Sequence, residues 1–340
     1  MAAAADTAEH IKERTTGELR TFAKRNSQRW NRSLIASVLG PTPNTSPSTR
    51  LSGRTRGSET ASSLDKILAG DNPLKLETGA ADWWTVHRGL SPVLGTAIHN
   101  GHGVRSAVDA LLAISDDDRL REEDPFTEFV IRDVPNRIVF HRSRFEVDLN
   151  RARQAAVYLS PEQAWGMDIW SDKPAPETIE DSLRVHDDYY SMLRQVLRGL
   201  EERHGRFVVL DVHSYNHRRG GPNAAPSDPE TAPDINIGTF SMDRERWAHV
   251  VEPFIATLRT FEFRGHRMDV RENVAFEGRG EQTRFIHEAF PETGCAIAVE
   301  LKKFFMDEWT GLPDRAALVA MRAMIRSTLP ILEDGLQATT

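Results

Sequence analysis

The sequence predicts an α/β fold, in which helices cover a β-sheet. Two continuous apolar runs, FVVLDV at residues 207–212 and GCAIAVEL at residues 294–301, are typical of buried strands. Between residues 94 and 332, runs of this kind alternate with longer stretches of helical periodicity. Because alternating strands and helices assemble into a sheet with helices on its faces, the pattern indicates an α/β sheet.

The individual elements are predicted from short apolar runs for strands and from amphipathic periodicity for helices. Strands are expected at residues 94–98, 137–140, 207–212, 235–240 and 294–301. Helices are expected at residues 106–114, 178–203, 244–261 and 314–332. The first strand runs into a glycine-rich turn at residues 100–103, and polar residues follow the strand at 207–212 directly.

The N-terminal part differs in composition from the rest. Residues 1–40 have apolar side chains at loosely helical spacings among charged ones, which predicts a helical appendage. Residues 41–63 are rich in Ser, Thr, Pro, Gly and Arg, so residues 41–70 are interpreted as a flexible linker. The folded body is expected to begin between residues 64 and 83, and residues 71–336 are assigned to one catalytic domain.

Composition narrows the classes of function. The 340 residues carry a formal net charge of −7, which gives no general attraction to nucleic acid or to an anionic membrane. The single cysteine, Cys295, excludes an internal disulfide and a cysteine-based zinc site, so any metal needs His and carboxylate ligands. No apolar run approaches the roughly 20 residues of a membrane span, and no secretory leader is recognised. A cytoplasmic location is therefore expected, and the oligomeric state is left open.

Polar residues stand at three predicted strand ends, where ligands bind in α/β sheets. These segments are IHNGHG at 98–103, DVHSYNH at 211–217 and VEL at 299–301. His99 and His102 are three residues apart across a glycine-rich turn, which lets two imidazoles converge on one ion, and His213 would complete a three-ligand site open to water. In a chain with 12 histidines the first spacing alone arises easily by chance, and the three strand ends together favour a catalytic zinc.

Glu300 lies within an apolar strand, where a carboxylate is costly unless it is paired, protonated or close to a metal. It is interpreted either as a buried partner of Lys302 or of an arginine, or as a general base beside the metal.

The segment HRSRFEVDLNRAR at residues 141–153 contains four arginines around Asn150. A guanidinium group binds a carboxylate with two parallel hydrogen bonds, so the segment indicates an anion site, the alternative being a solvated run of charges. Arg151, next to Asn150, is the preferred candidate.

Together these segments resemble the zinc carboxypeptidase superfamily, in the order IHNGHG, VDLNRAR, LDVHSYNH and AVEL. The closest likeness is to the N-formylglutamate amidohydrolase group, which EEDPFTEF (122–129), APDINIGT (232–239) and NVAFEGRGEQTRFIH (273–287) also resemble. The resemblance covers residues 85–330. It implies a single zinc-carboxypeptidase-like domain, with a central mixed β-sheet flanked by helices, that hydrolyses a small carboxylated N-formyl or N-acyl amino acid.

The resemblance also assigns roles to residues. His99, His102 and His213 would bind Zn²⁺, Glu300 would be the general base, and Asn150 with Arg151 would hold the substrate carboxylate. Two further roles are hypotheses, Arg144 as the cation beside the oxyanion and Asp211 as the acceptor that orients an imidazole. Peptidases of the superfamily have Glu where this chain has His102, so either three neutral ligands hold the metal or His102 does not bind it.

Two other functions remain open on the sequence. One is a metallocarboxypeptidase or a deacylase for another acyl amino acid, although the Gly- and Pro-rich segment 218–233 could restrict the pocket to small substrates. The other is an inactive binding or scaffold protein that uses the N-terminal helix as its contact surface.

Overall fold

The computed structural model describes residues 83–338. The helical appendage and the linker predicted at residues 1–70 lie outside this part, as does the expected start of the domain at residue 71. Within residues 83–338, no helix combines the length and the apolarity needed to cross a membrane.

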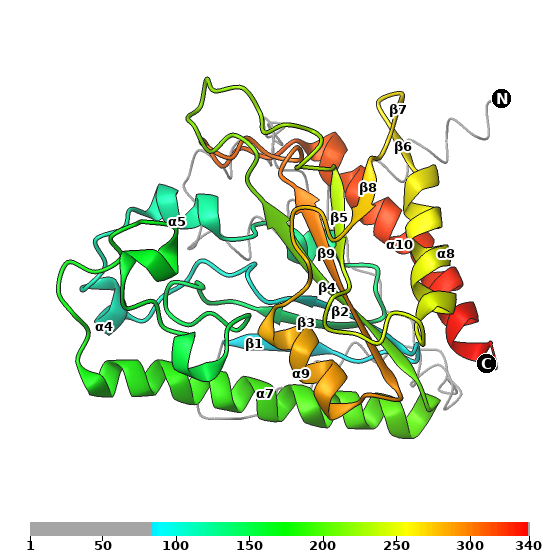
Figure 1. Ribbon diagram of the computed structural model, residues 1–340. Coiled ribbons are helices and arrows are strands. Elements are labelled where there is room, and N and C mark those ends of the chain that lie inside the picture. Colours follow the sequence, from blue (N-terminus) through cyan, green and yellow to red (C-terminus); the bar gives the residue numbers. More distant parts are fainter. Residues whose placement is uncertain (1–82, 339–340) are drawn as a thin grey trace, which may run out of the picture. The chain divides into compact units, whose positions relative to one another are not determined.

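The centre of the fold is a seven-stranded sheet with the order β1-β3-β2-β4-β9-β5-β8 (Figure 1). Its strands are β1 (Trp84–His87), β2 (Val93–Ala97), β3 (Asn136–Phe140), β4 (Phe207–Tyr215), β5 (Ile235–Gly238), β8 (Val270–Glu272) and β9 (Gly294–Lys302). The β1–β3 and β5–β9 pairs are antiparallel and the others are parallel. The predicted mixed sheet is confirmed.

Helices cover both faces of this sheet (Figure 1). The 29-residue helix α7 (Pro176–His204) and α9 (Glu281–Ala289) share one apolar cluster with Phe207 and Val209 of β4. On the other face α10 (Arg315–Gln337) packs against α8 (Ala248–Thr260) and contacts β2 and β4. The helices predicted at 178–203, 244–261 and 314–332 are confirmed with small shifts at their ends.

The remaining elements are short. They are α4 (Ser106–Asp109), α5 (Asp116–Glu122), α6 (Thr127–Val130), the 3₁₀ turns η1 (Arg153–Ala155) and η2 (Pro161–Ala164), and the hairpin of β6 (Glu262–Phe263) and β7 (His266–Arg267). The helix predicted at 106–114 is wrong in length. Its second half leaves the helix because Leu112 forms a bridge with Trp170 and the Ala113 N–H donates to the Ile169 carbonyl.

One face of β4 changes from apolar to polar along its length. Phe207 and Val209 face the core under α7 and α9, and Asp211 and His213 continue the same face toward the carboxyl end, because side chains alternate with a period of two. In the parallel register of β4 and β9, His213 lies opposite Glu300. The sheet thus brings polar groups side by side where its core ends.

Candidate metal centre and adjoining pocket

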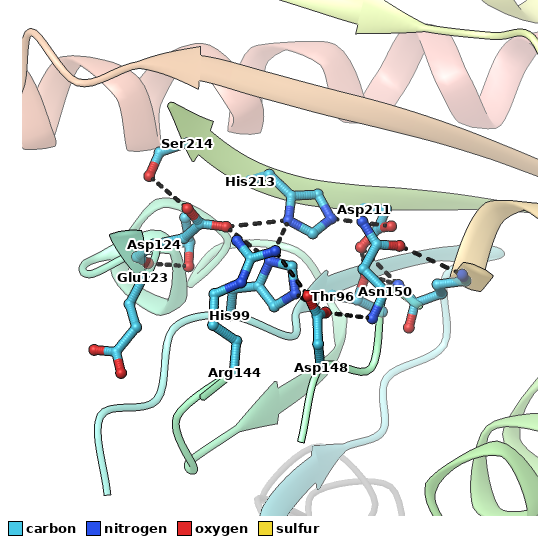
Figure 2. Close-up of polar contacts among 12 residues, drawn as sticks. Thr96, His99, Glu123, Asp124, Arg144, Asp148, Asn150, Asp211, His213 and Ser214 are labelled. Carbon is cyan, nitrogen blue, oxygen red and sulfur yellow. Dashed lines mark hydrogen bonds and ion pairs between the residues drawn. The ribbon is translucent and has the colours of Figure 1, made fainter. Parts of the chain in front are cut away.

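Two histidines and an aspartate converge at the carboxyl ends of β2 and β4 (Figure 2). The Nδ1 atoms of His99 and His213 are 3.1 Å apart. Asp124 Oδ2 lies 3.2 Å from the His99 Nδ1 and 3.1 Å from the His213 Nδ1. All three side chains are buried, and among the described residues they form the one group of His, Cys, Asp and Glu close enough to share a metal ion.

A carboxylate also lies on the far side of each ring, beside its Nε2 atom. His99 Nε2 is 2.7 Å from Asp148 Oδ1, and His213 Nε2 is 3.2 Å from Asp211 Oδ2. With a cation held at the two Nδ1 atoms, each Nε2 would carry the ring proton toward its carboxylate and each Nδ1 would offer a lone pair. Two imidazole nitrogens and a carboxylate oxygen that face one another are ligand atoms for a divalent cation, so the residues present fit a metal ion.

The ionisation state of Asp124 also fits a metal site. Burial alone would raise the pKa of this carboxyl group, but the hydrogen bonds from His213 and His99 outweigh burial and hold the pKa well below its usual range. The hydroxyl of Ser214 donates to the other oxygen at 3.1 Å. Asp124 is therefore ionised and held in a fixed orientation toward the two rings.

Asp148 is held by two further side chains, of which Figure 2 shows Arg144. Arg144 donates to its Oδ2 at 2.8 Å, and the hydroxyl of Tyr158 donates to the same oxygen. Burial would raise the pKa of Asp148, but the charge of Arg144 and the contact with His99 lower it well below the usual range. Arg144 also donates to the Tyr158 oxygen at 3.1 Å and lies over the Trp165 ring. In this structure Arg144 thus supports Asp148, and its expected contact with an oxyanion stays a prediction.

Asp211 is part of a buried network that joins the site to the helices. Its Oδ1 accepts hydrogen bonds from Thr96 Oγ1 at 2.9 Å and from Gln282 Nε2 at 2.6 Å. Gln282 in α9 accepts in turn from the Tyr189 hydroxyl of α7 at 2.5 Å. The network leaves Asp211 facing His213, as expected for the residue that orients an imidazole.

Glu300 stands beside the His–Asp–His group and lines the adjoining pocket. Burial raises its pKa to about 7, although the charge of His213 opposes the shift. The alternative in which Glu300 pairs with Lys302 is not what the structure contains, because Lys302 donates to the Ala232 carbonyl and pairs with Asp234 at 2.9 Å. At neutral pH the carboxyl group of Glu300 is therefore present in both its protonated and its ionised form.

His102 does not lie with the other two histidines. Its Nδ1 is 2.6 Å from Glu123 Oε2, and Glu123 points away from the His–Asp–His group in Figure 2. Asp124 occupies the third place for which the spacing of His99 and His102 suggested an imidazole. The glycine turn at 100–103 places His102 past the end of β2. The acidic segment before α6 folds back toward this turn, and the Asp124 N–H donates to the His99 carbonyl at 2.9 Å.

Asn150 and Arg151 lie on the segment that follows Asp148. Asn150 lines the pocket, and its carbonyl accepts the first N–H of α9, from Glu281, at 3.0 Å. The Arg151 guanidinium lies 4.6 Å above the Tyr158 ring centre, is 31% exposed, and donates to the Gln163 carbonyl at 2.8 Å. Both side chains are close to the site, and their expected grip on a substrate carboxylate is untested by this geometry.

The pocket has a volume of about 480 Å³ and extends from Glu300 to the segment 273–280. Asp211 and Ala298 form its floor on the same face of β4 and β9. Segment 218–233, which was expected to restrict the pocket, does not line it; Arg219 of this segment pairs instead with Glu122.

A mixed α/β sheet that brings a buried His–Asp–His group and a carboxylate together at its strand ends presents the groups that metal-assisted hydrolysis uses. The sequence model described as N-formylglutamate amidohydrolase matches residues 91–306, more than half of the chain. The chain therefore belongs to the N-formylglutamate amidohydrolase family.

Solved structures support the fold. An N-formylglutamate amidohydrolase from Ralstonia eutropha JMP134 superposes with a TM-score of 0.59 at 16% identity, over 74% of this chain and 98% of that one. A gene product from Agrobacterium tumefaciens gives a TM-score of 0.52 at 15% identity, over 75% and 94% of the two chains. The comparison with curated proteins gives no match. At these identities the likeness establishes a shared fold.

Proposed function

We propose that this protein is a zinc-dependent hydrolase that cleaves the amide bond of a small, carboxylated N-formyl or N-acyl amino acid. The single observation that carries the proposal is the convergence of two imidazole nitrogens on the carboxylate of Asp124, beside Glu300, which lies opposite His213 in the sheet. Family membership supports the reaction class, and the neutral or anionic ligand atoms support a divalent cation.

His99, Asp124 and His213 are the residues that would hold the metal. When bound, zinc lowers the pKa of a coordinated water and polarises the acyl oxygen. With the metal bound, Asp148 and Asp211 would keep the proton of each ring on Nε2 and so leave Nδ1 to the ion. This set replaces the three histidines expected from the sequence, with Asp124 in place of His102.

Glu300 is the proposed general base. With a pKa of about 7, its carboxyl group is ionised in a large fraction of molecules at neutral pH and still acidic enough to return a proton. It would accept a proton from the attacking water and deliver it to the leaving amine nitrogen. Asn150 and Arg151 would bind the substrate carboxylate and so fix the amide beside Glu300, and Arg144 would face the oxyanion.

The test combines metal content with turnover. Purified protein should carry close to one equivalent of zinc and hydrolyse N-formyl amino acids, and Glu300→Gln should lower kcat by about a thousandfold or more at unchanged zinc content. The exposed residue Glu288, which pairs with Arg284 on α9, provides the matched control Glu288→Gln. Full activity in Glu300→Gln would remove Glu300 from the mechanism.

Two other outcomes would replace the proposal. Cleavage of short peptides in preference to acyl amino acids would identify a carboxypeptidase. Absence of bound metal after gentle purification, together with failure to bind added zinc, would identify an inactive binding protein.

A further inference from the structure

The wall of the pocket beside Glu300 presents two exposed apolar side chains. Val274 is 42% exposed and Phe276 is 41% exposed, and both belong to the segment 273–280 that lines the pocket. Neighbouring apolar side chains that stay exposed within one pocket mark a binding surface more often than an isolated exposed residue does. The wall therefore offers apolar area to a bound molecule.

This wall is held rigidly next to the site. Asn236 of β5 is fully buried and lies opposite Glu300 in the sheet. Its Oδ1 accepts the N–H groups of Val274 and Ala275, both at 2.9 Å, and its Nδ2 donates to the Phe276 carbonyl at 2.6 Å. One side chain thus fixes three consecutive backbone units, and a wall fixed in this way binds without a large ordering cost.

The ring of Phe276 is held as well. Tyr215 of β4 packs edge-on against it, with 5.4 Å between ring centres, and the Tyr215 hydroxyl donates to the Pro233 carbonyl. Phe276 therefore keeps its position at the pocket although it is partly exposed.

The charged groups of the pocket are already engaged. Among the described residues that line it, Arg279 is the one lysine or arginine; its Nε donates to Glu277, and its guanidinium lies over the Phe240 ring. The Asp211 carboxylate accepts from Thr96 and Gln282. The one cation of this described lining is therefore exposed and already paired with Glu277, so a second substrate carboxylate would have to compete with Glu277 for Arg279 and would otherwise be costly to bury.

We propose that this pocket binds the side chain of the amino-acid part of the substrate, and that the enzyme prefers N-formyl or N-acyl derivatives of neutral, apolar amino acids to those of glutamate. The inference rests on the proposed amide hydrolysis and deepens it by naming the substrate class. A glutamate side chain would place its carboxylate near Glu300 and near Glu277, which already pairs with Arg279, whereas a leucine or methionine side chain would cover Val274 and Phe276.

The first experiment compares substrates on the full-length, zinc-loaded protein. N-formyl-L-leucine and N-formyl-L-methionine should have a kcat/KM at least tenfold above that of N-formyl-L-glutamate. Dissociation constants of the same compounds, measured by calorimetry on Glu300→Gln, should show the same order. Equal or tighter binding of N-formyl-L-glutamate, or binding of none of the three compounds, would overturn the pocket assignment.

The two experiments separate this inference from the proposed function. If the apolar compounds bind more tightly but none is hydrolysed by the zinc-loaded protein, the pocket assignment stands and the proposed hydrolysis fails. If all are hydrolysed and glutamate is preferred, the hydrolysis stands and the pocket assignment fails.

A charge introduced into the wall provides the second test. Val274→Arg should shift the ratio of kcat/KM for formyl-glutamate to formyl-leucine by at least tenfold toward glutamate. Leu90→Arg is the matched control, because Leu90 is 70% exposed, precedes β2 at the opposite end of that strand from His99, and does not line the pocket. Thermal unfolding of both variants checks that they fold, and an unchanged ratio in folded Val274→Arg contradicts the assignment.

Discussion

Each imidazole of the centre has a carboxylate behind it. Asp148 faces His99 and Asp211 faces His213, and each is fixed by its own donors, Arg144 in one case and Gln282 in the other. When a cation binds, these acceptors would hold the ring protons on Nε2, so that the two Nδ1 lone pairs meet the ion beside Asp124. The sequence reasoning selected Asp211 because it stands two residues before His213. It left out Asp148, although Asp148 stands two residues before Asn150, just as Asp211 stands two residues before His213.

The ligand set can be tested by exchanging single residues. Asp124→Asn should weaken zinc binding by roughly 100-fold or more, because a charged ligand of the group is lost, whereas His102→Gln should change it by less than about threefold. Competition with a chelating dye measures both affinities. Equal losses in the two variants would return His102 to the ligand set.

His287 is a buried histidine far from these ligands in the sequence, and its protonation should affect the stability of the fold. The ring is buried, accepts the Ala296 N–H of β9 at 2.9 Å, and contacts Ser241 at 3.0 Å. Burial lowers the pKa of His287 to about 4. The unfolded chain, with an ordinary histidine pKa near 6.5, therefore binds more protons than the folded chain between these values. Stability falls as the pH drops through this window, by on the order of 3 kcal/mol for this group when the pH has fallen below both pKa values.

The expected result is a smaller loss of unfolding free energy between pH 7 and pH 4.5 in His287→Gln than in the unmodified chain. Urea unfolding at several pH values measures it. His266→Gln is the control, because it removes a histidine that is 67% exposed instead of a buried one. An identical profile in His287→Gln would show that its protonation does not limit stability.

At the scale of elements, the glycine-rich turn after β2 positions His99. A Cβ atom on Gly101 would lie 2.1 Å from the His141 carbonyl carbon and 2.3 Å from the Arg142 nitrogen, so only glycine lets the two backbones approach this closely. A Cβ on Gly103 in the same turn would come no closer than 3.4 Å, to the His141 oxygen. The turn thus contains one essential glycine and one replaceable glycine.

Gly101→Ala should destabilise the fold by about 3 kcal/mol, because backbone must move to relieve the overlap, and should reduce zinc binding with it. Gly103→Ala should cost less than about 1 kcal/mol. Thermal and denaturant unfolding of the two variants gives the comparison, and similar stability of both would mean that the His141 segment adapts.

The strands and long helices followed from local pattern, but the connecting elements did not. The buried runs of β4 and β9 and the amphipathic faces of α7 and α10 are long enough to be recognised by themselves. The short elements α4 and β8 have four and three residues, and their limits depend on distant residues, through the pairing of Leu112 with Trp170 just after α4 and the pairing of β8 with β5. Intrinsic propensity over so few residues is too weak to specify them.

At the scale of the molecule, metal binding should be coupled to folding, because the three proposed ligands come from segments that only the folded sheet brings together. An ion present at roughly 1,000 times its dissociation constant stabilises the fold by about 4 kcal/mol. Removing the ion with a chelator should therefore lower the melting temperature by about 10 °C. Scanning fluorimetry with and without chelator, followed by zinc re-addition, measures the shift. Asp124→Asn should show little shift, and an equally large one there would mean that the ion stabilises the fold elsewhere.

By itself the sequence determined the α/β class, the principal strands, and the positions of His99, His213, Asp211 and Glu300 at strand ends, because buried strands are apolar and their polar ends stand out. Only the tertiary structure decided that Asp124 joins them, that His102 turns to Glu123, and that residues 273–280 form the pocket wall. The physical reason is that strand pattern is local, whereas the path of a loop depends on distant contacts. Asp124 reaches the rings because of how its segment folds across the sheet, and no spacing in the chain specifies that contact.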